Sequence, residues 1–120
     1  KLFKKIYDIV LQSQIKAIEA CREGVSCSEL DGLAREFIKS KGYGENFGHS
    51  LGHGVGIEVH EEPMVSRKSK TILKKNMAIT IEPGIYIKGI GGVRIEDLVL
   101  VKENCCEVLY KSAKACITLG

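Results

Sequence analysis

The sequence has no apolar run that approaches the ~20 consecutive residues needed to cross a membrane. It also lacks the continuous apolar core of a secretory signal, because the residues after its charged N-terminal lysines are periodic. Of its 120 residues, 44% are hydrophobic and 28% are charged, proportions that are typical of soluble globular domains. We therefore expect one modest domain over residues 1–120, located in the cytoplasm and not associated with a membrane.

Neither sign of charge dominates the chain, since 18 basic and 15 acidic residues are scattered along it and leave a net charge of +3. This balance gives no electrostatic reason to predict nucleic-acid binding. One basic cluster lacks interleaved aromatic residues and is predicted to be a solvated loop face. Its members are Arg67, Lys68, Lys70, Lys74 and Lys75.

The cysteines lack the paired spacing of metal knuckles. There are five of them, and Cys105 and Cys106 are adjacent and poorly placed to bridge each other. The sequence therefore predicts reduced, mostly buried thiols, as is usual in the cytoplasm.

Two amphipathic helices are predicted in the N-terminal third of the chain. Apolar residues recur at steps of three and four between Leu2 and Cys21, which favours a long helix there. Ser26 and Glu29 have the spacing of a capping box, in which the serine oxygen accepts a hydrogen bond from the backbone three residues on. A second helix is expected to follow and to end at Gly42 in a left-handed conformation.

After Gly42 the glycines are too frequent for a helix interior, where each costs ~1 kcal/mol relative to alanine. Alternating or β-branched runs separated by turn residues predict a mostly antiparallel meander. These runs are Met77–Glu82, Ile85–Ile87, Val93–Val101 and Glu107–Tyr110. The expected fold class is α+β, with two helices packed on one face of a sheet.

All three histidines fall in the glycine-rich segment HSLGHGVGIEVHEEP, residues 49–63. His49 and His53 have the spacing of a helical zinc motif, but the glycines exclude a helix. His53 lies between two glycines that let the backbone bend and another group approach, which favours a ligand role. A hydrogen-bonded structural role is an alternative for His49, and His60 lies beside two glutamates.

Two further charged positions indicate chemistry. Glu82 ends the run MAITIE, and the following Pro83-Gly84 has the composition of a type II turn, so Glu82 is expected to point into a cleft. Arg94 and Glu96 share one face of the next strand, and both faces of that strand are largely apolar. A buried charge must be paired or metal-bound, so an Arg94–Glu96 ion pair is the alternative to a ligand role for Glu96.

One imidazole and two carboxylates, without a cysteine ligand, favour a moderately hard divalent ion such as Mn, Co, Fe or Zn. The segments HSLGHGVGIEVHEEP, ITIEPGIYI and GGVRIEDLVLV resemble, in order and spacing, the C-terminal part of the proline-specific peptidases of the creatinase-type, pita-bread metallopeptidase family. The resemblance covers nearly the whole chain and is strongest to the Xaa-Pro dipeptidases (prolidases), with the aminopeptidases P next.

This resemblance implies a pita-bread fold with a curved sheet, metal-dependent hydrolysis of Xaa-Pro bonds, and proline-containing di- or short peptides as substrates. It also implies a homodimeric complete enzyme with two divalent ions, such as manganese, cobalt, zinc or iron. In that family the ions are held by two aspartates, one histidine and two glutamates. His53 resembles the histidine ligand, and Glu82 and Glu96 resemble the two glutamate ligands.

Other roles follow from the same resemblance. Glu82 also resembles the residue that shuttles a proton, and His60 resembles the histidine that contacts the scissile carbonyl. His49 resembles the residue that lines the proline pocket, and Arg94 the one that pairs with an aspartate ligand.

The departure from the family concerns the two aspartate ligands, which come from a hairpin upstream of the first helix. Asp8 and Asp31 lie on predicted helices and do not fit that pattern. The chain is therefore expected to be a partial catalytic domain that holds three of five ligands and is inactive alone.

Two other function classes remain open. A catalytically silent relative could act as a binding module, although it would have no chemical need for His53, Glu82 and Glu96 together. Creatine amidinohydrolase shares the fold without using metal, so the same three residues count against it. The last class is a structural chain with buried ion pairs, which would show no carboxylate-dependent metal binding.

Overall fold

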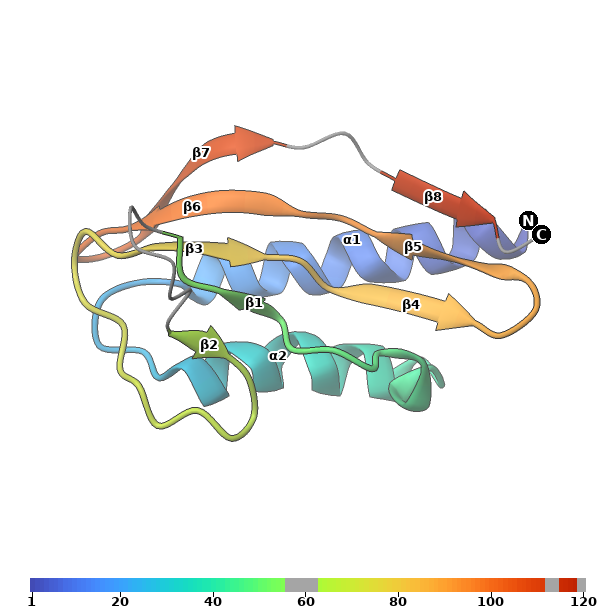
Figure 1. Ribbon diagram of the computed structural model, residues 1–120, viewed down its shortest axis with the longest axis horizontal. Coiled ribbons are helices and arrows are strands. Elements are labelled where there is room, and N and C mark those ends of the chain that lie inside the picture. Colours follow the sequence, from blue (N-terminus) through green and yellow to red (C-terminus); the bar gives the residue numbers. More distant parts are fainter. Residues whose placement is uncertain (56–62, 112–114, 119–120) are drawn as a thin grey trace.

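The computed structural model describes residues 1–55, 63–111 and 115–118, in which two α-helices lie against antiparallel strands (Figure 1). The elements are α1 (Leu2–Ala20), α2 (Cys27–Ser40), the 3-10 helix η1 (Gly44–Asn46), β1 (Gly52–His53), β2 (Met64–Val65), β3 (Ala78–Ile81), β4 (Gly84–Ile87), β5 (Gly91–Arg94), β6 (Asp97–Val101), β7 (Cys106–Lys111) and β8 (Ala115–Thr118). The α+β class expected from the sequence is confirmed. The short strands β1, β2 and β8 were not among the predicted runs, and Val93–Val101 is divided between two strands.

Both predicted helices form, and their ends follow from local chemistry. The Ser26 hydroxyl caps α2 by accepting a hydrogen bond from the Glu29 N–H at 3.1 Å, as the capping box predicts. The Glu29 carboxylate accepts from the same hydroxyl at 3.1 Å. Gly42 follows α2 with φ of +93°, which is the left-handed conformation expected of a helix-ending glycine.

The strands form three antiparallel ladders, in the orders β1-β2, β3-β6-β7 and β4-β5-β8. Backbone hydrogen bonds also join the first ladder to the second, because Glu82 N–H donates to Leu51 O at 2.7 Å and Val55 N–H donates to Ala78 O at 2.9 Å. The segment containing β1 therefore runs antiparallel beside β3, as Figure 1 shows. The predicted antiparallel meander is confirmed.

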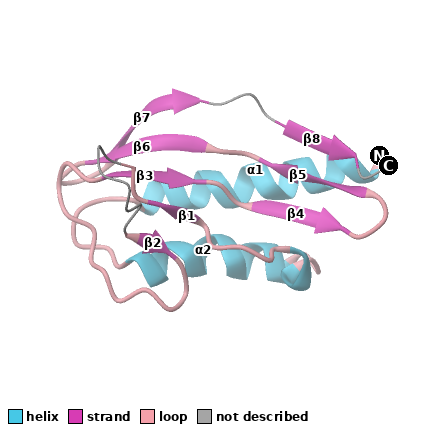
Figure 2. Cartoon of the chain, in the orientation of Figure 1, coloured by secondary structure: helices cyan, strands magenta, loops and turns pink. Residues whose placement is uncertain are grey.

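The strand β3 pairs with β6, and β4 pairs with β5, in the same register. Ile81 pairs with Asp97 and Gly84 with Arg94, so no residue is inserted or skipped between the two ladders. The ribbon accordingly continues from β3 into β4 and from β5 into β6 (Figure 2). By this register, Glu82 stands opposite Glu96.

The type II turn predicted at Pro83-Gly84 is wrong. Gly84 is not among the residues with positive φ, and the chain continues extended into β4. The reversal occurs at Gly89, which has φ of +81°. Gly84 instead allows close packing, because a Cβ there would lie 2.9 Å from the ring of Tyr86.

The two faces of the sheet differ in burial. α1 packs on one face, against β3, β4 and β5, and α2 packs on α1. Residues with odd numbers on β5, β6 and the link between them face this core and are buried, namely Val93, Ile95, Asp97, Val99 and Val101. Arg94 and Glu96 lie on the other face and are only half-buried, so the expectation of burial on both faces is wrong.

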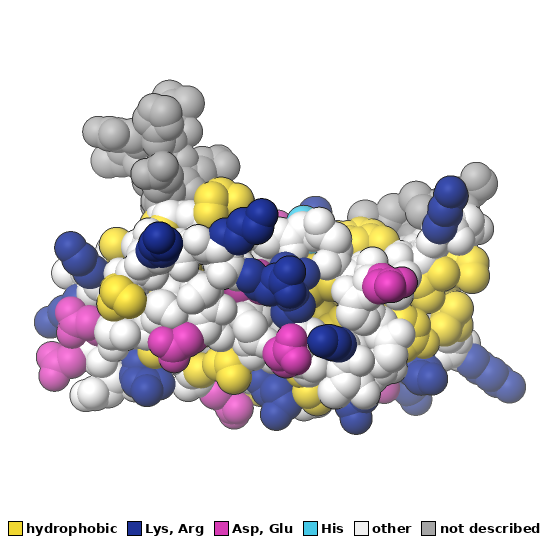
Figure 3. Space-filling model, turned by 90° about the horizontal axis from the view of Figure 1, so that it is seen from below, with side chains coloured by type: hydrophobic (Ala, Val, Ile, Leu, Met, Phe, Trp, Pro, Cys, Tyr) yellow, Lys and Arg dark blue, Asp and Glu magenta, His cyan; other side chains and the backbone are white. Residues whose placement is uncertain are grey.

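The surface carries charges of both signs, which are interspersed on the face shown in Figure 3. The predicted basic cluster lies between β2 and β3, and its members Arg67, Lys68, Lys70, Lys74 and Lys75 are all exposed, as expected of a solvated loop. Within the described residues, no helix is long and apolar enough to cross a membrane.

Four cysteines, Cys21, Cys27, Cys105 and Cys106, are free thiols. Cys21 and Cys27 are buried as expected, whereas Cys105 is exposed. A hydrogen bond between the thiols of Cys21 and Cys106 raises the pKa of Cys21 and lowers the pKa of Cys106. Burial raises the pKa of Cys27. The two buried thiols are therefore poor nucleophiles in the folded protein.

Candidate metal centre

His53 is placed by β1 beside the middle of β3. Its backbone N–H donates to the Thr80 hydroxyl at 3.1 Å, and Thr80 is 4% exposed. Gly52 makes this close approach possible, because a Cβ there would collide with the Thr80 carbonyl. The glycines around His53 thus serve the close packing that the sequence indicated.

The side chains of His53 and Glu82 meet on the sheet face opposite α1. Nε2 of His53 lies 3.5 Å from Oε2 of Glu82, and the side chains are 29% and 15% exposed. Glu82 follows β3 directly, and its N–H bonds to Leu51, two residues before His53. Paired backbones therefore hold the imidazole and the carboxylate together.

The hydrogen bonds of His53 define which ring nitrogen can act as a ligand. Nδ1 lies 3.0 Å from the Gly54 carbonyl, which can only accept, so Nδ1 carries a proton. In the neutral ring, Nε2 then presents a lone pair toward Glu82. A ring N–H donated to a backbone carbonyl is the usual way in which a metal-binding histidine is oriented.

Glu82 Oε2 is buried without a hydrogen-bond partner among the described residues. Two acceptor atoms, Nε2 and Oε2, thus face each other, an arrangement that costs free energy unless a proton or a cation lies between them. Two ligands bound at ~2.1 Å to one tetrahedral ion are about 3.4 Å apart. His53 and Glu82 therefore fit a divalent cation in both donor type and spacing.

Glu96 stands opposite Glu82 in the register and is half-buried on the same sheet face. No group of three His, Cys, Asp or Glu close enough to hold a metal occurs within the described residues. The structure therefore brings His53 and Glu82 together and places Glu96 on a neighbouring strand segment. None of the ion pairs found between described residues joins Arg94 to Glu96.

A buried side chain of α1 supports the backbone at this point. Gln14 is 2% exposed, and its Nε2 donates to the carbonyls of Ile81 at 3.3 Å and Ile95 at 3.4 Å. These carbonyls directly precede Glu82 and Glu96. Gln14 therefore holds both carboxylate-bearing segments where the strands leave the regular ladder, a role that the helix pattern did not reveal.

His49 lies between two aromatic rings, with centroids 5.1 Å from Phe47 and 5.6 Å from Tyr86. Its Nδ1 donates to the Ser50 carbonyl at 2.7 Å. Its Nε2 is buried and has no hydrogen-bond partner among the described residues. Two ring contacts and one hydrogen bond thus fix the imidazole, and Nε2 is left as the atom that could contact a ligand. His60 lies outside the described residues.

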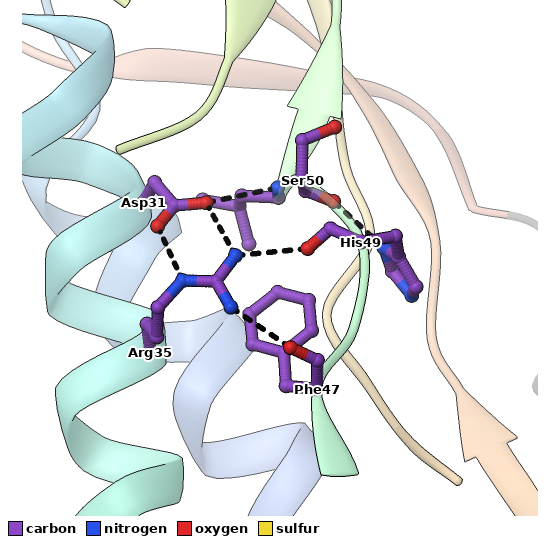
Figure 4. A network of polar contacts seen from close by, with 6 residues as sticks. Asp31, Arg35, Phe47, His49 and Ser50 are labelled. Carbon is purple, nitrogen blue, oxygen red and sulfur yellow. Dashed lines mark hydrogen bonds and ion pairs between the residues drawn. The ribbon is translucent and has the colours of Figure 1, made fainter. Parts of the chain in front are cut away.

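Sequence reasoning missed a network that anchors the loop carrying His49 (Figure 4). Arg35 binds both carboxylate oxygens of Asp31, at 2.8 and 3.0 Å, and also donates to the carbonyls of Phe47 and His49, each at 2.8 Å. The available signal was the Asp-x-x-x-Arg spacing, which places both side chains on one face of a helix.

Comparison with known proteins agrees with this architecture. The sequence model of metallopeptidase family M24 matches residues 1–103. The Xaa-Pro dipeptidase of Pyrococcus furiosus is 55% identical over 111 residues, which are 92% of this chain and 32% of that protein. A solved prolidase from Pyrococcus furiosus superposes with a TM-score of 0.90 at 54% identity, over 94% of this chain and 34% of that one. The solved X-Pro aminopeptidase from Thermotoga maritima superposes with a TM-score of 0.88 at 48% identity, over 93% of this chain and 32% of that one.

The chain spans about a third of the length of these relatives. The structural matches confirm the pita-bread fold that the sequence motifs imply. The family match extends from α1 through the strands that carry His53, Glu82 and Glu96. The chain belongs to metallopeptidase family M24.

Proposed function

We propose that the complete protein containing this chain hydrolyses the peptide bond between an amino acid and a following proline, with divalent metal ions as cofactors. The observation that carries this proposal is the half-buried pair of His53 Nε2 and Glu82 Oε2, which lie 3.5 Å apart. The similarity to a Xaa-Pro dipeptidase supports the substrate class.

We assign His53, Glu82 and Glu96 as metal ligands. Two divalent ions, when bound, supply Lewis acidity and lower the pKa of water. Glu82 accepts the proton of the attacking water and passes it to the leaving amine, because its carboxylate lies at the centre of the site. The other two ligands of the family's set, both aspartates, would come from outside these 120 residues. Arg94, on the same sheet face, is assigned to pair with one of them.

The substrate side of the site is assigned to the histidines. His49, between Phe47 and Tyr86, offers a pocket wall that suits the apolar ring of proline. Its Nε2 can contact the polar groups that flank that ring. By resemblance to the family, His60 contacts the scissile carbonyl and stabilises the charge that develops on it.

Several finer features belong to the same proposal. The ions are manganese, cobalt, zinc or iron, since nitrogen and carboxylate donors accept all four. The complete enzyme is a cytoplasmic homodimer, and its free thiols are consistent with a reducing compartment. The 120-residue chain alone is inactive, because it supplies three of the five ligands.

The test is hydrolysis of alanyl-proline by the complete protein after removal of metal and titration with Mn²⁺ or Co²⁺. We expect activity to depend on the added ion and to disappear in Glu96→Gln, with alanyl-alanine as the control substrate. Metal-independent activity would contradict the metal assignment. Binding of alanyl-proline without hydrolysis would instead indicate a binding module.

A further inference from the structure

The loop Phe47–Leu51 carries one proposed substrate residue and ends two residues before His53. It contains no regular secondary structure, so its own backbone cannot define its position. The loop is nevertheless held at three successive odd-numbered residues by a single ion pair on α2. This ion pair consists of Asp31 and Arg35, and we call it the clamp.

Arg35 provides the clamp's contacts with the start of the loop. Nη1 donates to Phe47 O and Nη2 to His49 O, both at 2.8 Å, while Cζ lies 4.2 Å from the centroid of the Phe47 ring. The planar guanidinium thus fixes two carbonyls and one ring at once, which a lysine ammonium cannot do.

Asp31 provides the contact with the end of the loop. It is fully buried, and its Oδ2 accepts from Leu51 N–H at 3.1 Å. The carbonyl of Leu51 in turn accepts from Glu82 N–H at 2.7 Å. One residue therefore connects the clamp to the backbone of the proposed proton-shuttling glutamate.

We propose that Asp31 and Arg35 are positioning residues, which set the place of His49 through the loop carbonyls and the place of Glu82 through Leu51. The assignment of a reaction to these positions rests on the proposed function. The clamp has two parts with different consequences. The Arg35 part governs substrate binding at His49, and the Asp31 part governs the catalytic step at Glu82.

The first test uses Arg35→Lys in the complete, metal-loaded protein. The lysine keeps a positive charge beside Asp31 but loses the two-carbonyl fork, so KM for alanyl-proline should rise about tenfold with little change in kcat. The matched control is Arg22→Lys, because Arg22 is an exposed arginine that donates to the Ala20 carbonyl. A folded Arg35→Lys protein with wild-type KM would overturn the proposal.

The second test removes both charges in Asp31→Leu/Arg35→Met. Replacing a buried ion pair by apolar residues of similar size is often neutral for stability, and Leu51 N–H keeps its second acceptor, Val65 O, at 2.8 Å. This variant should melt near the wild-type temperature while kcat/KM falls about 10- to 100-fold, with kcat now affected. Wild-type kinetics in this variant would show that the clamp contributes stability alone.

A measurement without catalysis separates the clamp from the proposed function. The ¹³Cε1–¹H signals of the histidines are recorded in metal-free wild-type, Arg35→Lys and Arg22→Lys proteins. The His49 signal should shift in Arg35→Lys alone, because its position between two aromatic rings makes it sensitive to small displacements. If the wild type does not hydrolyse alanyl-proline, the proposed function fails, and this signal decides the clamp: a shift supports it and an unchanged signal overturns it.

Discussion

Asp31 and Glu82 each lie beside a basic side chain, but their surroundings differ. Both carboxylate oxygens of Asp31 accept hydrogen bonds, Oδ1 from Arg35 Nε and Oδ2 from Arg35 Nη2 and Leu51 N–H. Glu82 has a histidine nitrogen at 3.5 Å, and its Oε2 has no hydrogen-bond partner in the described part of the chain. In the first pair both carboxylate oxygens have donors, and in the second Glu82 Oε2 has none among the described residues.

The difference shows how to distinguish a structural ion pair from a binding site. A buried carboxylate stabilises a fold only when donors satisfy its oxygens, because desolvation otherwise outweighs the attraction. Asp31 meets that condition within the protein. Glu82 Oε2 has no such donor among the described residues, and a proton or a cation between it and His53 Nε2 would satisfy it.

The largest expected effect comes from Glu82→Gln in the complete protein. The amide cannot accept a proton and is a weaker metal ligand, so kcat/KM for alanyl-proline should fall about 10³-fold. Steady-state kinetics at saturating metal provides the measurement. Glu107→Gln is the matched control, because Glu107 is an exposed surface residue near Lys102, and it should retain wild-type activity.

The same chemical change in the other pair should affect stability most. In Asp31→Asn the amide group presents donors toward the donors of Arg35 or Leu51 and leaves the guanidinium unpaired. We expect the free energy of unfolding to fall by about 3 kcal/mol, measured by urea denaturation of the metal-free protein. Asp8→Asn, at an exposed position on α1, should leave it unchanged. If Asp31→Asn lost no more free energy of unfolding than Asp8→Asn, Asp31 would not be satisfied as described.

The sequence pointed to the pair of His53 and Glu82 but not to the pair of Asp31 and Arg35. His53 and Glu82 were singled out because glycines and a proline made their local structure unusual, and the structure brings them into contact. The metal-ligand roles of His53, Glu82 and Glu96 stay predictions. Both helices follow from periodicity and the α2 cap from the spacing of Ser26 and Glu29, and these were predicted correctly. The alternation along β5 and β6 assigned residues to the two faces correctly, although burial of both faces was wrong.

The remaining features could not be predicted because they depend on contacts between distant segments. Gln14 looks like an ordinary helical residue, yet its amide bonds to carbonyls 67 and 81 positions away. Asp31 and Arg35 look like a surface i,i+4 pair until the loop closes over them. The turn at Pro83-Gly84 was wrong because pairing with β5 keeps this segment extended, which overrides its local turn composition.

A smaller effect is expected from Thr80→Val, which probes what places His53 beside Glu82. The valine removes the hydroxyl that accepts from His53 N–H and leaves that donor without its partner. We expect a loss of about 1 kcal/mol in the free energy of unfolding and a modest fall in kcat/KM. Thr80→Ser keeps the hydroxyl and should restore both. Equal behaviour of the valine and serine variants would mean that this hydrogen bond does not position His53.

The smallest expected effect, and the one with the opposite sign, is that of Glu82→Gln on the metal-free protein. Here the new amide can donate to His53 Nε2, so two facing acceptors become a hydrogen-bonded pair. The free energy of unfolding should stay unchanged or rise by up to about 1 kcal/mol, in contrast to the loss in Asp31→Asn. With Mn²⁺ added, the wild type should become more stable than Glu82→Gln, because the ion binds the folded wild type more tightly than the folded variant. If Glu82→Gln instead destabilised the metal-free protein as strongly as Asp31→Asn does, Glu82 would already be satisfied within the protein, and the distinction between the two carboxylates would fail.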